Sequence, residues 1–473
     1  MTFTYSDHRV SSIAINGTTL LSGVLYEAFG PARGWSWGNG TSEVRLYNTD
    51  GNPSQFSGLE STTYTLDNAF RITGITNTSN GALSWTYGYD LLDRLNSASK
   101  TGTTQGWTFD ANGNRLTQTG TTTATYTIST TNNQIKSITG TPARTYTYDA
   151  DGNVLTFSSD TFTFNNRGRM STAKASGSTT GYVYNALGQR IMKSGGPAGT
   201  VLYWYDEAGH LLGEYSSTGA LVQETVWMGD IPVATIRPNG SSVSVYYVHA
   251  DHLSTPKMVT QPSSNKIAWR WDQDPFGTAA PNQNPAGLGT FVYNLRFPGQ
   301  YYDTETGLNY NYFRDYDPQV GRYVESDPVS VGAHVATAIS RLTASSRTVT
   351  TDVIQDALMV SAGSVVAMAA RNLSEPIELN PYAYALKNPI SHADPSGLSP
   401  SGSNPGDPSM CPLVAQVLLG LEWGPPVLSQ WLCVYDCNTT CPPKASRYIT
   451  EIQTAIFPRF GCVSVYPRPW GLL

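Results

Sequence analysis

A short unit recurs about every 20 residues between residues 64 and 212, and it constrains the fold more than any other feature of the chain. Each copy places an aromatic residue, one intervening residue and a second aromatic or apolar residue before an Asp or Asn. A Gly usually follows three residues later, and an aliphatic residue comes shortly after it. The Asp or Asn positions are Asp67, Asp90, Asp110, Asp149, Asn165, Asn185 and Asp206, and Ser129 takes this place in a degenerate copy.

This unit predicts a β-hairpin. Side chains alternate between the two faces of a strand, so aromatic residues two positions apart project from the same face. An Asp or Asn side chain accepts hydrogen bonds from the backbone that follows it, and Gly supplies the positive φ of a tight turn. One hairpin cannot bury its aromatic face alone, so the stacked units should form one continuous sheet. The repeated Asp and Asn residues are therefore predicted to form turns rather than to act as acids or metal ligands.

The composition favours a folded β protein that does not bind nucleic acid. The 473 residues carry a formal net charge of −6 and only 14% charged residues, which gives no basic surface for nucleic acid or an anionic membrane. Aromatic residues make up 11% and supply ample apolar surface for a core. The stretch closest to a membrane span, residues 357–370, is too short to be one. The first residues lack a secretory signal, which indicates a fragment of a longer protein or export without a cleaved signal.

A second set of motifs follows the repeats. It comprises "YYVHADHLSTPKMVT" (246–260), "WDQDPFG" (271–277), "LRFPGQYYDTETGLNYNYFRDYDPQVGRYVESDP" (295–328) and "NPYAYALKNPISHADPSGL" (380–398). These motifs resemble the Rhs-associated core. The preceding units resemble the YD repeats of the Rhs family, which also occur in the C components of Tc toxins and in teneurins. The resemblance covers roughly residues 40–398.

The resemblance implies a mainly β fold, in which repeated β-hairpins form a long spiralling sheet. This sheet would make part of an Rhs shell around a polypeptide cargo, and the core would close one end. The implied division is a YD-repeat ribbon at residues 1–240, a core domain at 241–398 and a variable C-terminal tail at 399–473. The tail, a small Cys-containing segment, is the candidate cargo or toxin. An insertion at about 329–379 would interrupt the core. Its apolar residues recur at i, i+3 and i+4, which predicts that the insertion is helical.

The resemblance also implies an aspartyl self-cleavage site. Asp327 and Asp394 match the two cutting carboxylates of the family, and Arg314 matches its arginine. The bond cut would join Leu398 and Ser399. Two carboxylates held close together cannot both ionise, which leaves one base to activate water and one acid to protonate the leaving amine. The arginine would keep one carboxylate ionised or polarise the scissile carbonyl.

The insertion leaves this site open to a second interpretation. In the family a short Gly-rich link follows the first Asp-Pro pair, whereas residues 329–379 intervene in this chain. The insertion would either loop out at a small entropic cost or separate Asp327 from Asp394. In the second case, Asp327-Pro328 and Asp394-Pro395 would serve only to start turns.

No cofactor and no metal site is predicted in the ribbon or the core. His249 and His252, with Asp251, lack the further partner that a zinc site needs. The sequence shows neither a phosphate-binding loop nor a Ser-His-Asp arrangement. The cysteines of the chain all lie in the tail, at Cys411, Cys433, Cys437, Cys441 and Cys462. Disulfides are predicted for the tail if it leaves the cell, and a zinc site is the alternative.

Together these features predict an Rhs-type carrier that encapsulates a C-terminal cargo or toxin and releases it in interbacterial competition. Its enzymatic activity would be at most self-cleavage after Leu398. Its partners would be its own cargo inside the shell, an immunity protein and a secretion-system component, and it would be secreted or at the cell surface. One alternative is a non-enzymatic cell-surface or secreted repeat protein that binds carbohydrate or neighbouring cells. Another is a displaced Rhs tip without activity. The activity and target of the tail stay open.

Overall fold

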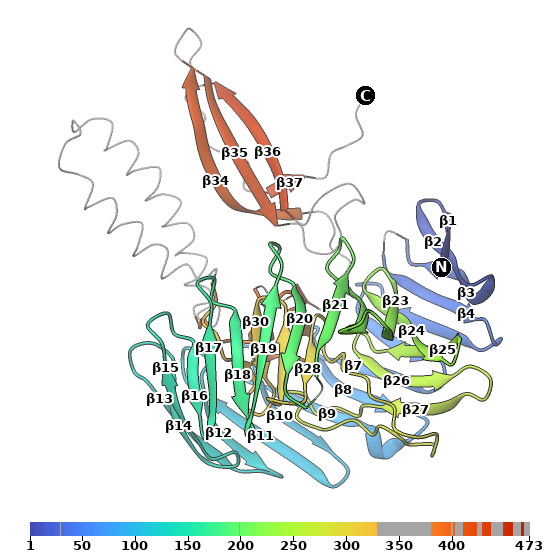
Figure 1. Ribbon diagram of the computed structural model, residues 1–473, viewed down its shortest axis with the longest axis horizontal. Helices are drawn as coiled ribbons and strands as arrows, with labels where there is room; N and C mark the ends of the chain where they lie inside the picture. The colour runs from blue at the N-terminus through green and yellow to red at the C-terminus, as the bar shows by residue number, and fades with distance from the viewer. Residues whose placement is uncertain are drawn as a thin grey trace.

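Figure 1 shows the computed structural model of the chain. The described residues are 1–328, except residues 29 and 198, and 380–398. In the tail, only the backbone of five strands is described. The helical insertion predicted at residues 329–379 lies outside the described residues, and so do the cysteine side chains of the tail with their predicted disulfide or zinc use. Within the described part of the chain, no helix is long and apolar enough to cross a membrane.

One antiparallel sheet of 27 strands, here called the ribbon, dominates the molecule (Figure 1). Each strand pairs with the next strand of the sequence, as in β1–β2, β13–β14 and β26–β27. The strands are β1 (Thr2–Ser6), β2 (Arg9–Ile15), β3 (Thr18–Tyr26), β4 (Ala32–Trp37), β5 (Ser42–Tyr47), β6 (Pro53–Ser57), β7 (Ser61–Leu66), β8 (Ile72–Asn77), β9 (Trp85–Tyr89), β10 (Leu95–Lys100), β11 (Thr103–Phe109), β12 (Arg115–Gly120), β13 (Ala124–Ile128), β14 (Ile135–Gly140), β15 (Arg144–Tyr148), β16 (Val154–Phe157), β17 (Asp160–Phe164), β18 (Met170–Ala175), β19 (Ser178–Tyr184), β20 (Arg190–Gly195), β21 (Val201–Tyr205), β22 (Leu211–Ser216), β23 (Leu221–Met228), β24 (Ile231–Asn239), β25 (Ser242–Ala250), β26 (Pro256–Gln261) and β27 (Lys266–Arg270). A short 3-10 helix, η1 (Gly81–Leu83), precedes β9. The prediction of a mainly β chain of repeated hairpins is confirmed.

The turn at Asp110 shows how the repeat works. Its Oδ1 accepts hydrogen bonds from the backbone N–H groups of Asn112 at 2.9 Å and Asn114 at 2.8 Å. Its Oδ2 accepts one from Asn114 Nδ2 at 2.9 Å, and Gly113 adopts a φ of +78° that other residues rarely take. The same backbone bonds to positions i+2 and i+4 recur at Asp67, Asp90, Asp149, Asn165, Asn185 and Asp206. The prediction that these residues form turns is confirmed.

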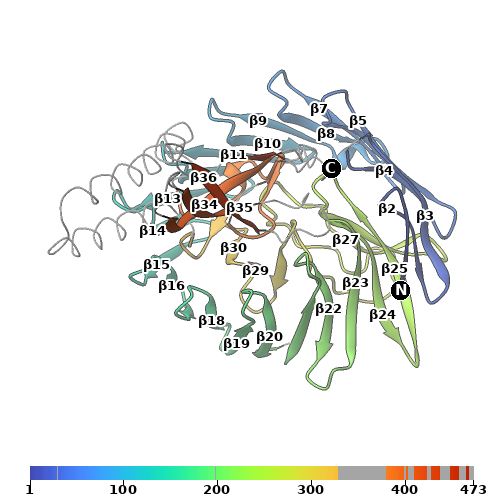
Figure 2. The same cartoon turned by 90° about the horizontal axis from the view of Figure 1, so that it is seen from above.

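One face of the ribbon is buried, because the strands follow the alternation that the sequence indicates. In β11, Trp107 is buried whereas its neighbour Thr108 is exposed. The buried face carries the aromatic residues of the repeats, which include Tyr64, Trp107, Tyr126, Phe162, Tyr182 and Tyr203. Seen from above, the strands follow one another around the molecule (Figure 2).

The two ends of the ribbon meet through side chains and not through a strand ladder, since no pairing joins β1 to β27 in the described sheet. Residues of β2, β3 and β4 form one hydrophobic cluster with residues of β23, β24 and β25. Trp37 stacks on Tyr247 with their ring centroids 4.6 Å apart. Polar contacts extend this seam, because Asn39 Nδ2 donates to Pro262 O at 3.0 Å and Arg270 Nη2 donates to Glu60 Oε2 at 3.0 Å.

Residues 271–328 and 380–398, here called the plug, pack against the inner face of the ribbon. They contain a four-stranded sheet of β28 (Tyr301–Asp303), β29 (Leu308–Asn311), β30 (Arg314–Asp317) and β31 (Arg322–Tyr323), followed by the 3-10 helix η3 (Ala385–Lys387) and β32 (His392–Ala393). Strands β29 and β30 lie inside the ring of ribbon strands (Figure 2). Four hydrophobic clusters join plug residues to ribbon residues, through side chains such as Phe276, Leu308, Tyr316 and Val320.

Cationic side chains of the ribbon also reach into the plug. Arg190, which is 1% exposed, donates to both carboxylate oxygens of Asp303, at 2.5 and 3.0 Å. Lys193 Nζ adds a contact to the same carboxylate at 3.0 Å, and Arg144 pairs with Asp317. Buried charges are tolerated only when they are paired, so these contacts fix the plug relative to the ribbon.

In the tail, the backbone forms β33 (Ser401–Gly402), β34 (Met410–Glu422), β35 (Leu428–Asp436), β36 (Tyr448–Ile456) and β37 (Val465–Pro467). Strand β35 lies between β34 and β36, β37 pairs with β34, and β33 pairs with β32 of the plug. The division of the chain at residues 240 and 398 stays a prediction. The strands of the ribbon continue past residue 240, through β25, β26 and β27.

Candidate functional site

Arg314 lies at the centre of the candidate site. It begins β30, which pairs with β29, and its residue exposure is 3%. Its guanidinium donates from Nε to Gly397 O and from Nη1 to Pro381 O at 3.0 Å, and it lies over the Tyr323 ring at 3.7 Å from the centroid. Contacts from three directions leave this side chain one orientation.

The remaining nitrogen of Arg314 joins the two aspartates. Its Nη2 lies 3.3 Å from Asp327 Oδ2 and 3.3 Å from Asp394 Oδ2. The structure therefore brings together all three residues that the resemblance implied, although residues 329–379 separate the two carboxylates in the sequence. Their catalytic role stays a prediction.

Asp394 is 1% exposed and closes a turn. Its Oδ1 accepts the backbone N–H of Leu398 at 3.0 Å, and its Oδ2 accepts Tyr323 Oη–H at 2.9 Å. Within this turn, Gly397 has a φ of +71°, and a Cβ there would lie 2.4 Å from Asn311 O, so only Gly fits. The turn that the second interpretation expected is present, and its carboxylate also reaches Arg314.

Asp327 is the more accessible of the two carboxylates. Its side chain is 17% exposed, against 1% for Asp394. Its backbone N–H donates to Pro381 O at 2.9 Å, which ties the segment before the insertion to the segment after it. This backbone contact explains how the two Asp-Pro pairs stay together across the insertion.

The predicted bond between Leu398 and Ser399 is described on one side only. Leu398 is half-buried, and its N–H is held by the Asp394 carboxylate as given above. Ser399 lies outside the described residues. The contact places the chain that leads into the predicted bond directly beside one carboxylate of the pair.

Asp315 and Glu325 form a second pair of acids, which the sequence did not single out as a site. They are 5% and 1% exposed, and Glu325 Oε2 accepts the Asp315 backbone N–H at 2.7 Å. Burial raises the pKa of Asp315 to about 6. Burial and then the neighbouring Asp315 charge raise the pKa of the Glu325 carboxyl well above its usual range. The adjacency to Arg314 and Asp327 in "RDYDPQVGRYVESDP" was the signal available in the sequence.

The two histidines of "VHADH" make separate contacts. His249 Nε2 lies 3.0 Å from Thr260 Oγ1, and His252 Nε2 lies 2.8 Å from Ile390 O. Among the described residues, no group of three or more His, Cys, Asp or Glu side chains is arranged to hold a metal ion.

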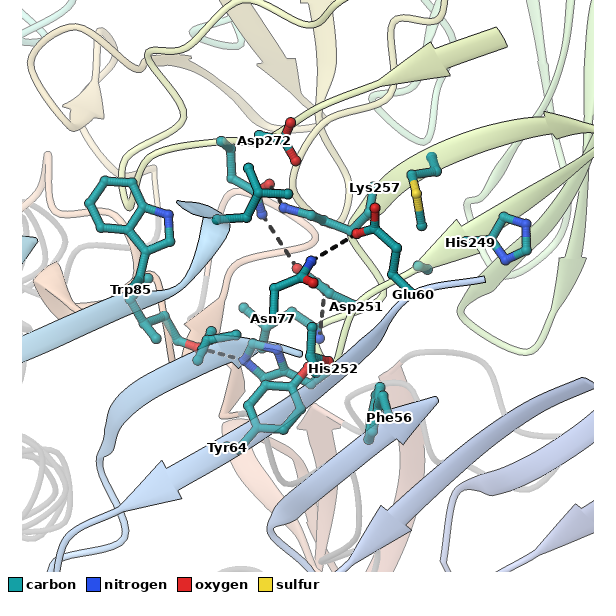
Figure 3. A pocket seen from close by; sticks show the side chains of 18 of the residues that line it. Phe56, Glu60, Tyr64, Asn77, Trp85, His249, Asp251, His252, Lys257 and Asp272 are labelled. Atoms are coloured by element: carbon teal, nitrogen blue, oxygen red, sulfur yellow. Dashed lines mark hydrogen bonds between the residues drawn. The ribbon is translucent and has the colours of Figure 1, made fainter. Parts of the chain in front are cut away.

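A cavity of about 140 Å³, here called the seam cavity, lies where β6–β9 approach β25–β27 and the plug. Figure 3 shows the aromatic side chains Phe56, Tyr64 and Trp85 that line it together with the polar side chains His252 and Lys257. Burial lowers the pKa of both His252 and Lys257. This cavity could not be predicted from the sequence, because its walls come from segments far apart in the chain.

Comparison with known proteins identifies relatives of the ribbon and the plug. The family model described as Teneurin YD-shell matches residues 55–342. The chain is 32% identical over 114 residues to the double-stranded DNA deaminase toxin A of Burkholderia cenocepacia, which covers 24% of this chain and 8% of that protein. It is 35% identical over 88 residues to the toxin protein Tse5 of Pseudomonas aeruginosa, which covers 19% of this chain and 6% of that protein.

The fold is similar to that of Tc toxin structures. The Tc holotoxin pore of Photorhabdus luminescens matches with a TM-score of 0.61 and 18% identity, over 84% of this chain and 20% of that chain. A crystal structure of a TcdB2-TccC3 protein matches with the same values. The chain therefore spans less than a tenth of the two toxins and about a fifth of the Tc chains.

Proposed function

The chain belongs to the Teneurin YD-shell family, and we propose that it is the cleaving end of a toxin-delivery shell. In this proposal the ribbon encloses part of a polypeptide cargo, the plug closes the ribbon, and the plug cuts the chain after Leu398. The tail from Ser399 onward would be the cargo, and the protein would act outside the cell that makes it. The names of the toxin relatives support the delivery role.

One observation carries the cleavage proposal: a single guanidinium nitrogen of Arg314 contacts Asp327 and Asp394 together. Two carboxyls held by one cation can act as a general base and a general acid. The ionised carboxylate accepts a proton from water, and the protonated carboxyl donates one. Water would attack the Leu398 carbonyl carbon, and the C–N bond to Ser399 would break as that nitrogen receives a proton. The products are the Leu398 carboxylate and the Ser399 amine.

The test is a denaturing gel of the full chain beside Asp327→Asn. We expect the parent to yield a C-terminal fragment whose first residue, read by N-terminal sequencing, is Ser399. Removal of one acid–base group should slow cleavage by about 10²–10⁴-fold, so the variant should stay intact. Asp50→Asn, in an exposed ribbon turn, serves as the control and should cleave like the parent. An intact parent chain, or a cut at another bond, would overturn the cleavage proposal.

Enclosure is tested separately by size-exclusion chromatography of the cleaved protein. If the ribbon holds the tail, the fragment should elute with the ribbon and plug in native buffer and separate from them only in denaturant. Separation in native buffer would show that the tail is not held.

The inward-facing aromatic residues of the repeats do not support carbohydrate binding, whereas Trp204 of one repeat is 67% exposed. The repeat residues that would stack on sugars, such as Trp107 and Tyr203, are 4% exposed and pack inside the ribbon. A buried ring offers no face to a sugar in solution.

A further inference from the structure

The Asp315–Glu325 pair is the strongest feature that the proposed cleavage chemistry does not use. Both side chains are almost fully buried, and each lies within hydrogen-bonding reach of the other. A buried carboxyl pair costs little only when one proton is shared between the two groups, because two adjacent negative charges without solvent repel strongly.

The charged surroundings of the pair are mixed. Arg190 and Arg169 of the ribbon favour a negative charge on Asp315, and Asp303 of the plug opposes it. The titratable side chains close enough to interact electrostatically with the pair are Arg169, Arg190, Asp303, Tyr182, Tyr184 and Tyr310. One negative charge on the pair is therefore balanced by the ribbon arginines, whereas a second charge would have no partner of its own.

The pair joins the two segments that carry Arg314 and Asp327. Asp315 directly follows Arg314, and Glu325 precedes Asp327 by two positions. The Glu325 carboxylate accepts the Asp315 N–H at 2.7 Å, and the Val324 N–H donates to Asp315 O at 3.0 Å. These two bonds join the start of β30 to the chain that leads into Asp327.

We propose that Asp315 and Glu325 are positioning residues that share one proton, and that this shared proton holds Arg314 in place against Asp327. The proposal rests on the proposed self-cleavage. When the pair holds one proton, the two segments stay together and Arg314 contacts both cutting carboxylates. When the pair loses its last proton, repulsion between Asp315 and Glu325 separates the segments, and cleavage slows.

The test is the pH profile of cleavage in the full chain. Protein isolated in denaturant before it cleaves is refolded at values between about pH 5 and about pH 9, and the cleaved fraction is followed on a gel. Cleavage by the parent should slow as pH rises. Glu325→Gln keeps an oxygen for the Asp315 N–H and carries no charge, so at the highest pH it should cleave at least about tenfold faster than the parent.

Two further variants separate positioning from folding. Glu325→Ala removes the acceptor for the Asp315 N–H and should slow cleavage at every pH. Glu305→Gln changes another plug carboxylate, which pairs with Lys193, and should keep the parent profile. If Glu325→Gln and the parent give the same pH profile, the positioning proposal is overturned.

A second readout does not depend on cleavage. In chains blocked by Asp394→Asn, the melting temperature is measured across the same pH range with and without Glu325→Gln. The carboxyl pKa values of the pair are raised by folding, so its stabilising effect is present at low pH and is lost as pH rises through about 6 and above. Glu325→Gln should flatten this fall.

The two readouts distinguish the possible failures. A flattened melting profile without cleavage at any pH would overturn the proposed function and the positioning role, and would leave the shared proton supported. Cleavage with identical profiles would overturn only the role of the pair.

Discussion

The turn at Asp149 in the ribbon and the turn at Asp394 in the plug share one hydrogen-bond pattern. In each, Oδ1 accepts the backbone N–H four residues later, at 2.8 Å from Asn153 and at 3.0 Å from Leu398. They differ at Oδ2. At Asp149 this oxygen accepts Asn153 Nδ2 of the same turn at 2.9 Å, whereas at Asp394 it contacts Tyr323 and Arg314 from other strands. A turn closed by its own residues is structural, and the same turn completed by distant groups can support chemistry.

The largest expected effect breaks this comparison directly. In Asp394→Asn, the amide oxygen can still accept the Leu398 N–H in place of the carboxylate oxygen Oδ1. The variant removes the negative charge that contacts Arg314. We expect cleavage to slow by about 10²–10⁴-fold in a chain that still folds, with a lower melting temperature because a buried partner of Arg314 is lost. The matched change Asp149→Asn should leave cleavage and melting temperature unchanged, because Asn185 already forms the same turn with Gln189. Equal effects of the two variants on cleavage would show that Asp394 is only a turn residue.

The second prediction compares an arginine that reaches the plug with one that closes its own turn. Arg190→Met leaves the buried Asp303 with Lys193 alone and should lower the free energy of unfolding by about 3–5 kcal/mol. Arg71→Met breaks a pair with Asp67 that is partly exposed and should cost at most about 1 kcal/mol. Urea unfolding monitored by tryptophan fluorescence measures both. Similar losses would mean that the ribbon–plug contacts contribute little to stability.

The third prediction concerns the ribbon turn closed by a histidine. Burial alone would lower the pKa of His210, but hydrogen bonds to Asp206 and Asp230 raise it to about 9. Because the folded pKa exceeds the unfolded value, the stabilisation is full below about pH 6.5 and is lost as pH rises through about 9, to an extent of at most about 3 kcal/mol. His210→Asn should remove this dependence. Melting temperatures at the two ends of this window check it, and parallel profiles would contradict it.

The smallest expected effect restores the repeat in its degenerate copy. Ser129 Oγ accepts the Thr131 N–H at 3.4 Å, a longer contact than the 2.9 Å that Asp110 makes with Asn112. Ser129→Asp should therefore raise the free energy of unfolding by roughly 0.5 kcal/mol. Ser129→Ala is the control and should lower it. The midpoint of urea unfolding measures both, and a loss of stability in Ser129→Asp would show that this turn does not follow the repeat.

The ribbon could be predicted from the sequence because its structure is local. The bonds at Asp110 join residues within one turn, and the burial of Trp107 follows from strand alternation. The plug is different, because the Arg190–Asp303 pair and the Asp315–Glu325 pair join residues that only the folded chain brings together. The site residues Arg314, Asp327 and Asp394 were chosen by resemblance alone, since their spacing does not distinguish catalysis from turn formation.

The meeting of the ribbon ends has a mechanical consequence. A closed barrel can open only if a ladder of backbone hydrogen bonds breaks along the whole length of a strand. In this chain, the joint between β2–β4 and β23–β25 consists of side-chain contacts such as the Trp37–Tyr247 stack. Separating the ends would expose apolar surface and leave each hairpin intact. Opening at this joint would therefore cost side-chain contacts and no strand ladder.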